Sequence, residues 1–303
     1  MSKTEKTILI TGGSGLIGKY LTKQLQSNGY KVRWLVRRPT NGPVEMFRWS
    51  TDENFIDPKA FEGTNCIIHL AGENVGAARW TNKRKKAILD SRVKTSELLI
   101  QHIKASGARI ETFIAASAIG IYGGDTNEVP KSESSENGKD FLAMVTHEWE
   151  KSLEPMHELV DRMITFRIGV VLSKKGGALL KLMLPIKFFV GSPLGTGKQM
   201  ISWIHIEDLI RMFLFAVENE NLSGTFNAVA PAPVSNAALT KALAKNLKRP
   251  LLLPNVPAFV LRLVLGELSE MVLFGSKVSC EKILKAGFEF SYPDVESALD
   301  SPA

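Results

Sequence analysis

The chain has little cysteine, little histidine and no long uninterrupted apolar run, and each shortage excludes a class of protein. Its 303 residues include two cysteines, Cys66 and Cys280, which are too few for a disulfide framework or a cysteine-rich metal site. The five histidines are scattered without metal-ligand spacing, so we expect no bound metal. The segment 249–276 is apolar, but prolines and charged residues interrupt it before about 20 apolar residues accumulate, which argues against a membrane span.

The overall composition is that of an ordinary globular protein. Hydrophobic residues make up 44% and charged residues 23%, and the length allows one large α/β domain or a domain with a smaller appendage. The polar residues 1–6 show no signal peptide, and with the low cysteine content they predict a reduced, cytoplasmic protein. The net charge of +7 favours anionic ligands such as phosphates, with nucleic acid as the alternative.

The distribution of positive charge decides between these ligands. A basic cluster lies near the start of one expected helix and consists of Arg79, Lys83, Arg84, Lys85 and Lys86. Apart from Trp80, no aromatic side chains are interleaved with it, as a nucleic-acid surface often has. We therefore interpret the cluster as a solvated helix face and expect no nucleic-acid partner.

Short apolar runs alternate with helical periodicity along the first two thirds of the chain. Strands are predicted at 7–11, 31–36, 66–71, 112–116 and 164–172, and helices at 16–28, 80–104 and 141–153. The strands are continuously apolar, which indicates that both faces of their sheet are covered. The pattern predicts an α/β protein with a doubly wound parallel sheet.

Glycine- and proline-rich segments set the rest of the chain apart. We expect residues 1–172 and 200–230 to form the sheet domain, and residues 173–199 and 231–303 to form a smaller lid over a ligand cleft. This division places the apolar segment 249–276 in the lid.

The sequence ITGGSGLIG follows the first predicted strand and opens the first predicted helix. It spaces Gly12, Gly15 and Gly18 as G-x-x-G-x-x-G. Glycines at such a turn let the backbone approach a pyrophosphate, and the helix N-terminus then holds the anion. Strand and helix flank the motif as a dinucleotide site requires.

The next predicted strand indicates which nucleotide is bound. Sites for NAD usually carry an acidic residue there, but this chain has Arg37 and Arg38 instead. Guanidinium groups suit a 2′-phosphate, so NADP is favoured over NAD.

In combination, several motifs resemble those of the extended short-chain dehydrogenases/reductases. The chain is most similar to the atypical group called the epimerase family, or sugar-nucleotide-epimerase-like proteins. The resemblance covers nearly the whole chain and rests on TGGSGLIG, HLAGEN, SAIGIYG, the W-T-x-x-R-K helix at 80–92, the segment 197–209 and the C-terminal region 249–299. It implies a Rossmann-type fold with a smaller C-terminal substrate lid, and NADP as the cofactor.

The resemblance also implies roles for particular residues. Residues 12–18, including Leu16 and Ile17, hold the pyrophosphate, and Leu70 and Ala71 line the adenine and ribose path. Arg92 contacts a cofactor phosphate or the substrate, or it forms a surface ion pair. Candidate substrate contacts are Glu73, Asn74 and His205, the last of which we expect to order a loop together with Asp208.

One departure from the family pattern concerns catalysis. Ordinary members use a Ser and a Tyr-x-x-x-Lys, in which the Tyr acts as general acid/base. Ser117 fits the Ser position, but Phe141 or Leu142 stands at the Tyr position, and Val145 or Thr146 at the Lys position. The remaining candidates for proton transfer are Ser117, Tyr122 and a substrate-bound water.

Two function classes therefore remain open. The first is an NADP-dependent oxidoreductase or epimerase-like enzyme whose small-molecule substrate is a nucleotide sugar or a carbonyl compound. The second is a non-catalytic NADP-binding redox sensor or regulatory protein, which the missing Tyr and Lys favour. The resemblance also implies a possible homodimer through the helices at 80–104 and 141–153.

Overall fold

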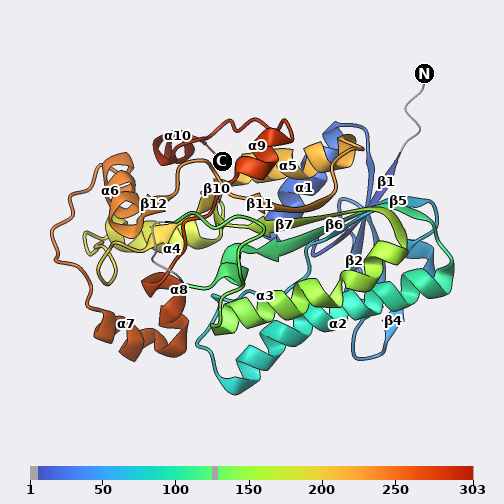
Figure 1. Ribbon diagram of the computed structural model, residues 1–303, viewed down its shortest axis with the longest axis horizontal. Coiled ribbons are helices and arrows are strands. Elements are labelled where there is room, and N and C mark those ends of the chain that lie inside the picture. Colours follow the sequence, from blue (N-terminus) through green and yellow to red (C-terminus); the bar gives the residue numbers. More distant parts are fainter. Residues whose placement is uncertain (1–5, 125–128, 303) are drawn as a thin grey trace.

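A mostly parallel sheet forms the centre of the computed structural model, which describes residues 6–124 and 129–302 (Figure 1). Within these residues eight strands follow the order β11-β7-β6-β5-β1-β2-β3-β4, and every pair is parallel except β3 and β4. The strands are β1 (Thr7–Thr11), β2 (Lys31–Val36), β3 (Glu45–Ser50), β4 (Phe55–Ile56), β5 (Thr64–His69), β6 (Ile110–Ala118), β7 (Val160–Ile168) and β11 (Gly224–Ala228).

Helices cover both faces of this sheet, as the continuously apolar strands predict (Figure 1). Ile8 and Ile10 of β1 join one hydrophobic cluster with α1 (Leu16–Ser27) and α5 (Ile206–Glu218). Leu9 points the other way, into a second cluster with α2 (Asn82–Ser106) and α3 (Phe141–Ser152). Alternate residues of one strand therefore serve two separate cores, and the predicted doubly wound parallel sheet is confirmed.

Several elements differ from their predicted bounds, and three strands of the main sheet were not predicted. The strand predicted at 164–172 is divided by Gly169, where a Cβ atom would lie 2.6 Å from the Ser202 carbonyl oxygen. The chain leaves the main sheet at this close approach and pairs β8 (Val170–Leu172) with β10 (Trp203–His205). The helix predicted from residue 80 begins at residue 82, because the Thr81 side chain caps it. The three strands of the main sheet that were not predicted are β3, β4 and β11.

A smaller group of elements lies beyond the carboxyl ends of the central strands. A third hydrophobic cluster, which includes Trp203 and Leu172, joins α4 (Ala178–Lys187), α6 (Asn236–Asn246) and α10 (Val295–Asp300). The other elements of the second half of the chain are β9 (Met200–Ile201), β12 (Val234–Ser235), α7 (Ala258–Leu265), α8 (Glu270–Leu273) and α9 (Glu281–Lys285).

The C-terminal segment also returns to the main sheet. Val278, Ile283 and Phe288 belong to the same hydrophobic cluster as α1 and α5. Fully buried Asp208 of α5 holds this segment, because its carboxylate accepts hydrogen bonds from the backbone N–H groups of Ser291 and Tyr292, both at 2.9 Å. The C-terminal segment, which we assigned to the lid, therefore packs on the sheet domain. The predicted boundaries between the two domains stay a prediction.

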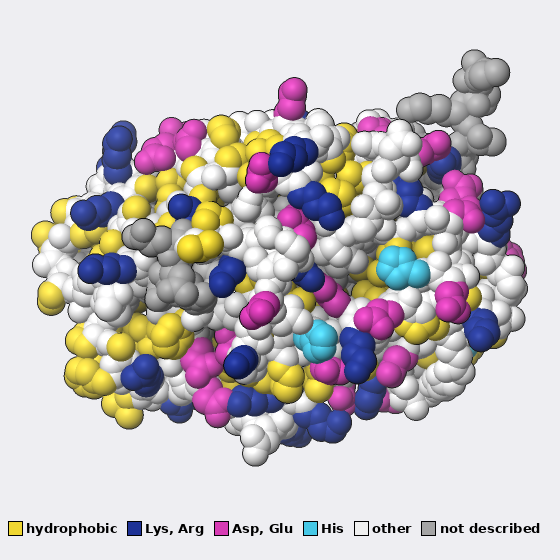
Figure 2. Space-filling view, in the orientation of Figure 1, with side chains coloured by type: hydrophobic (Ala, Val, Ile, Leu, Met, Phe, Trp, Pro, Cys, Tyr) yellow, Lys and Arg dark blue, Asp and Glu magenta, His cyan; other side chains and the backbone are white. Residues whose placement is uncertain are grey.

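Charged and hydrophobic side chains gather on different parts of the surface. Figure 2 shows charged side chains of both signs over α2 and α3, and hydrophobic side chains gathered towards α7. On α7, Phe259, Leu263 and Val264 are exposed. The two helices proposed for a homodimer thus present a largely charged surface, and dimerisation stays a prediction.

The structure bears on membrane-spanning helices, metal ligands and reactive cysteines. No helix among them combines the length and apolarity needed to cross a bilayer. Within 6–124 and 129–302, no three His, Cys, Asp or Glu side chains are grouped as metal ligands. Burial raises the pKa of the Cys66 thiol to about 12 and that of Cys280 to about 11, so neither is a reactive thiolate. Residues 1–5, from which we predicted no signal peptide, lie outside the described residues.

The Asp208 contact gives a stability prediction. Asp208→Ala leaves two backbone N–H groups without their acceptor, so the free energy of unfolding should fall by about 3 kcal/mol. Asp208→Asn keeps one side-chain oxygen and should lose less. Urea unfolding of the three proteins measures both losses, and a loss below about 1 kcal/mol for Asp208→Ala would show that the carboxylate does not anchor the segment.

Candidate functional site

The glycine turn between β1 and α1 packs more closely than side chains would allow. Gly12 has φ +71°, and a Cβ atom there would lie 2.9 Å from the Leu70 carbonyl oxygen. A Cβ atom at Gly18 would lie 2.5 Å from the Gly12 carbonyl oxygen. The turn therefore brings α1 against the end of β5, and only glycine fits at these two positions.

The N-terminus of α1 is open. Gly15 is its N-cap, and among the described residues no side chain caps the first turn of the helix. In contrast, Thr81 caps α2 and Asp140 caps α3. Ser14 and Gly15 are exposed. The backbone N–H groups at Leu16 and Ile17 are therefore available to an anion, which the helix dipole also favours.

A pocket of about 550 Å³ adjoins this turn. It is lined by Ser14, Trp34, Val36, Arg37, Arg38, Thr40 and Met46. Trp34 forms its inner wall: the indole Nε1–H donates to the Thr22 hydroxyl at 2.8 Å, and the ring packs where a Cβ atom of Gly13 would lie. Arg37 and Arg38 are exposed at its rim. No carboxylate lines the pocket, so it is suited to an anionic group.

A threonine hydroxyl joins the ends of β1 and β5. The Thr11 Oγ1 accepts hydrogen bonds from the backbone N–H groups of Leu70 and Ala71, each at 3.1 Å, and lies 2.8 Å from Nδ1 of His69. Its single proton is therefore donated to His69, whose own proton sits on Nε2. Burial and the nearby Arg92 lower the pKa of His69 to about 3, so this imidazole is neutral at ordinary pH.

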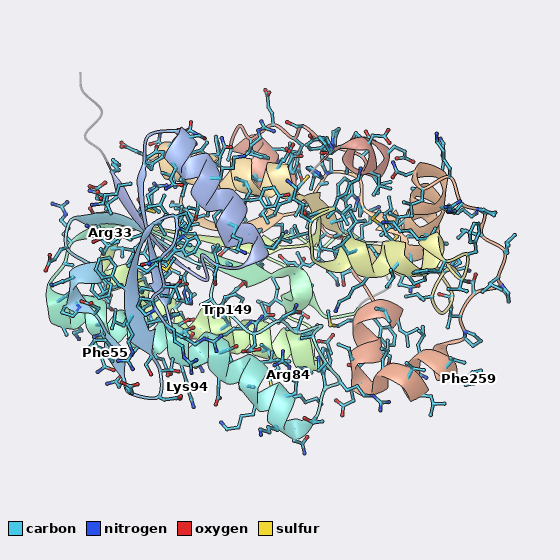
Figure 3. All side chains as sticks on the ribbon, turned by 180° about the vertical axis from the view of Figure 1, so that it is seen from behind. Arg33, Phe55, Arg84, Lys94, Trp149 and Phe259 are labelled. Carbon is cyan, nitrogen blue, oxygen red and sulfur yellow. The ribbon has the colours of Figure 1, made fainter. Side chains whose placement is uncertain are left out.

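The loop after β5 rests on α2. Arg92 donates to the carbonyl oxygens of Glu73 and Ile88 at 3.2 and 3.0 Å, and its guanidinium lies 5.0 Å from the Trp149 ring centre. Burial lowers the pKa of Arg92 to about 10, which leaves it charged at ordinary pH. The carboxylate of Glu73 pairs with Arg84 at 2.9 Å. Figure 3 shows Arg84 on α2 and Trp149 on α3.

A largely buried ion pair lies near the carboxyl ends of β6 and β7. Arg167 of β7 binds both carboxylate oxygens of Glu150 on α3, at 2.9 and 2.8 Å. Ser117 of β6 donates to the same carboxylate at 2.5 Å. Although burial opposes the charge, Glu150 raises the pKa of Arg167 overall. The pair fixes the position of α3 relative to the sheet.

The same arginine also holds Tyr122, which lies in the 3₁₀ turn Ile119–Tyr122. Arg167 donates to the Tyr122 hydroxyl at 3.0 Å, and this hydroxyl donates to the Asn227 side chain at 2.6 Å. Tyr122 is buried, and burial raises the pKa of its phenol. Both sequence-predicted acid/base candidates, Ser117 and Tyr122, thus belong to one hydrogen-bonded network.

Uncharged side chains of α3 stand at the positions of the missing Tyr and Lys and form a wall beside Gly120. Leu142 and Thr146 on α3 face Gly120, where a Cβ atom would lie 3.4 Å from the Leu142 Cβ and 3.6 Å from the Thr146 Oγ1. The Thr146 hydroxyl is occupied by the Leu142 carbonyl oxygen at 2.8 Å. This wall has no group that moves a proton at neutral pH.

The predicted substrate residues Glu73, Asn74 and His205 do not all lie together. Asn74 follows Glu73 in the loop after β5, and its side-chain oxygen accepts the Gly76 backbone N–H at 2.9 Å. His205 instead packs on Tyr292, with ring centres 4.0 Å apart, and burial lowers its pKa. Asp208 binds the backbone of the same segment, so His205 and Asp208 both contact it.

The basic cluster at 79–86 is largely engaged in contacts within the chain. Arg79 donates to the Leu263 carbonyl oxygen of α7, and Lys85 pairs with Glu267. Arg84 and Lys86 pair with Glu73 and Asp90. The cluster therefore joins α2 to the C-terminal region.

Sequence reasoning missed Arg167, Glu150 and His69 as organisers of this region. A signal for Arg167 was present, because an arginine within the apolar run ITFRIGVVL needs a buried partner. The partner could not be identified, since Glu150 lies on a helix with other carboxylates. The Thr11 and His69 contact depends on strand register, which the sequence does not supply.

A parallel sheet whose first strand runs through a glycine turn into an uncapped helix defines the class of dinucleotide-binding α/β proteins. The NAD dependent epimerase/dehydratase family matches residues 8–145, and a domain of unknown function, DUF1731, matches residues 256–301. The epimerase family protein YfhF of Bacillus subtilis is 36% identical over 96% of both chains. The chloroplastic SDR39U1 homolog of Arabidopsis thaliana is 35% identical over 98% of this chain and 86% of its own. The chain belongs to the epimerase family, an atypical group of the extended short-chain dehydrogenases/reductases, as the sequence motifs indicated.

Solved structures agree with this assignment. The human epimerase family protein SDR39U1, solved with NADPH, is 29% identical, with a TM-score of 0.85 over 97% of each chain. UDP-glucose 4-epimerase of Thermotoga maritima, solved with UDP-glucose, is 18% identical, with a TM-score of 0.75 over 97% of this chain and 96% of its own. The second likeness shows the fold alone. The Rossmann-type fold expected from the sequence is confirmed.

The buried His69 predicts a pH dependence of stability. The folded protein keeps this imidazole neutral, whereas the unfolded chain binds a proton below about pH 6.5. Its stabilising contribution is therefore complete above that pH and is lost as the pH falls towards 3. Between pH 6.5 and 4.5 the loss should be about 2 kcal/mol.

Urea unfolding at several pH values tests this contribution. His69→Gln should reduce the decline in stability over that range by the amount just given, while His147→Gln, at an exposed histidine of α3, should leave it unchanged. An identical decline in the wild type and His69→Gln would contradict the interpretation.

Proposed function

We propose that this chain is an NADP(H)-dependent oxidoreductase acting on a carbonyl-bearing small molecule. The observation that carries the proposal is the pocket beside the glycine turn, which has Arg37 and Arg38 at its rim and no carboxylate. Such a rim suits a 2′-phosphate and lacks the acidic residue typical of NAD sites. The human relative solved with NADPH supports the same cofactor.

The geometry suggests how the chain holds this cofactor. The open N-terminus of α1, at Gly15, Leu16 and Ile17, receives the pyrophosphate. Leu70 and Ala71, fixed by the Thr11 hydroxyl, line the nucleotide path. Arg92 lies beneath the same loop and bonds to its backbone, so its proposed role is to hold the loop in place.

The bound nicotinamide supplies or accepts a hydride at the substrate carbon. The chain must then provide or receive a proton at the carbonyl oxygen, and the usual Tyr and Lys are absent. Ser117, Tyr122 or a substrate-bound water takes this role in our proposal, with Glu73 and Asn74 as the proposed substrate contacts. His205 is buried against Tyr292 and is not among them. Because a positioned general acid contributes about 10² to 10⁴ in rate, we expect a slow enzyme or one acting on easily reduced carbonyls.

A specific observation supports a second candidate function. Ser117 and Tyr122 both hydrogen-bond to the buried Glu150–Arg167 pair, which leaves neither hydroxyl without a partner. A non-catalytic NADP-binding sensor or regulator needs no proton donor and is compatible with such a network. Activity measurements separate this alternative from the enzyme.

The first prediction concerns cofactor preference. NADPH should bind at least about tenfold more tightly than NADH, which corresponds to about 1.4 kcal/mol from the contact with the 2′-phosphate. Calorimetric titration of both cofactors measures the ratio. The Arg37→Ala/Arg38→Ala variant should abolish the preference, and equal affinities in the wild type would refute the proposed role of the two arginines.

The second prediction concerns turnover. NADPH should be oxidised in the presence of at least one compound from a panel of aldehydes, ketones, quinones and nucleotide sugars. Ser117→Ala should slow this reaction without weakening NADPH binding, and Tyr122→Phe serves as the parallel variant.

The outcomes of this experiment separate the two function classes. Tight NADPH binding without any turnover would favour the regulator. Unchanged turnover in both variants would support the enzyme but would exclude the Ser117 and Tyr122 hydroxyls as proton donors. A substrate-bound water would then be the proton source.

A further inference from the structure

A groove lies on the outer side of the α1 and α5 layer. Its volume is about 890 Å³, and it runs between the two helices and is bounded by the loop after β8 and by Pro302. Figure 3 shows α1 at the front of this layer. The groove is lined by Leu16, Lys19, Tyr20, Lys23, Gln24, Ser27, Lys175, Gly176, Glu207, Ile210, Arg211 and Pro302.

Three lysines of this groove come from two different elements. Lys19 and Lys23 are one turn apart on the exposed side of α1, and Lys175 belongs to the loop after β8. Among residues 6–124 and 129–302, none of the three forms an ion pair. The Lys175 ammonium lies 5.3 Å from the centre of the Tyr20 ring, which orients it over the groove.

The other two charged groups of the lining are already engaged. Arg211 at the α5 side donates to the buried Asp208 carboxylate at 2.9 Å, which balances its charge. The carboxylate of Glu207 accepts the Tyr292 hydroxyl at 2.6 Å. The three lysines outnumber the one carboxylate that remains, Glu207, so the groove keeps a net positive charge. A concave surface attracts anions more strongly than a flat surface does, because its low-dielectric walls focus the field.

This groove is separate from the proposed cofactor site. It follows α1 from Leu16 to Ser27, a distance of about 16 Å along the helix axis at 1.5 Å per residue. Arg37 and Arg38 line the other pocket and not this one. The two sites meet only near the start of α1, where a Cβ atom at Gly176 would lie 3.2 Å from Leu16.

We propose that the groove binds a small anion carrying several phosphate groups. Its cations are spread over α1, α5 and the loop after β8, so a single phosphate does not reach all of them. Unpaired lysines bind phosphates as point charges, which suits such a ligand. The proposal does not depend on the function proposed above, since its cations lie outside the proposed cofactor site and only Leu16 belongs to both.

Calorimetric titration with tripolyphosphate at low ionic strength tests this proposal. The wild type should bind it, and Lys19→Ala/Lys23→Ala should weaken the affinity at least tenfold. A matched control is Lys241→Ala/Lys245→Ala, which removes two exposed lysines with the same spacing on α6 and should leave the affinity unchanged. The Arg37→Ala/Arg38→Ala variant should also retain this binding, although it loses the cofactor preference.

Several outcomes would overturn the proposal. One is the absence of tripolyphosphate binding in the wild type, and another is binding lost in Arg37→Ala/Arg38→Ala but kept in Lys19→Ala/Lys23→Ala. Equal losses in the α1 and α6 variants would show that net charge alone is responsible. A parallel titration with duplex DNA adds a further check: if the α1 variant weakens DNA binding but not tripolyphosphate binding, the groove is a nucleic-acid surface instead.

Discussion

The site region depends on one steric constraint, the close approach of β1, α1 and the end of β5. The Gly12 backbone lies against the Leu70 carbonyl, and Gly18 lies against the Gly12 carbonyl, at distances that exclude a side chain. Thr11 then joins both strand ends through three hydrogen-bonding contacts to Leu70, Ala71 and His69. Because of this packing, the uncapped end of α1, the arginine-rimmed pocket and the loop after β5 surround one place at the edge of the sheet.

A second constraint acts on the other side of the same edge. The Glu150–Arg167 pair joins α3 to β7 and also binds Ser117 and Tyr122. In ordinary members of the extended reductases, the corresponding helix supplies the Tyr and Lys of the proton relay. Here that helix presents Leu142 and Thr146 to Gly120, and its carboxylate is used within the core. The positions usually used for proton transfer in this fold thus carry groups that pack or hold structure.

Much of the fold could be predicted from the sequence, because local patterns determine it. The alternation of apolar strands with periodic helices predicts the parallel sheet, and the spacing of Gly12, Gly15 and Gly18 predicts the turn into α1. Strand β3 was missed because EMFRWS is short, is interrupted by charge and follows a proline-containing loop. The break at Gly169 could not be predicted, since its cause is the approach of Ser202 from a distant part of the chain.

The site was predicted less completely, for a similar reason. Arg37 and Arg38 could be found because their role follows from their place at the end of one strand. The partners of Arg167, Arg92 and His69 come from other elements, and pairing of that kind requires the strand order and register. The groove along α1 is a further example, because its lysines are scattered over the sequence and meet only in the folded chain.

A crystal structure with NADPH bound is the most direct test of the central claim, that the glycine turn and the two arginines form an NADP(H) site. We predict that the 2′-phosphate contacts Arg37 or Arg38, that the pyrophosphate accepts backbone N–H groups at the start of α1, and that the nicotinamide lies towards Gly120. A 2′-phosphate turned into solvent, or a cofactor bound away from the glycine turn, would contradict the account.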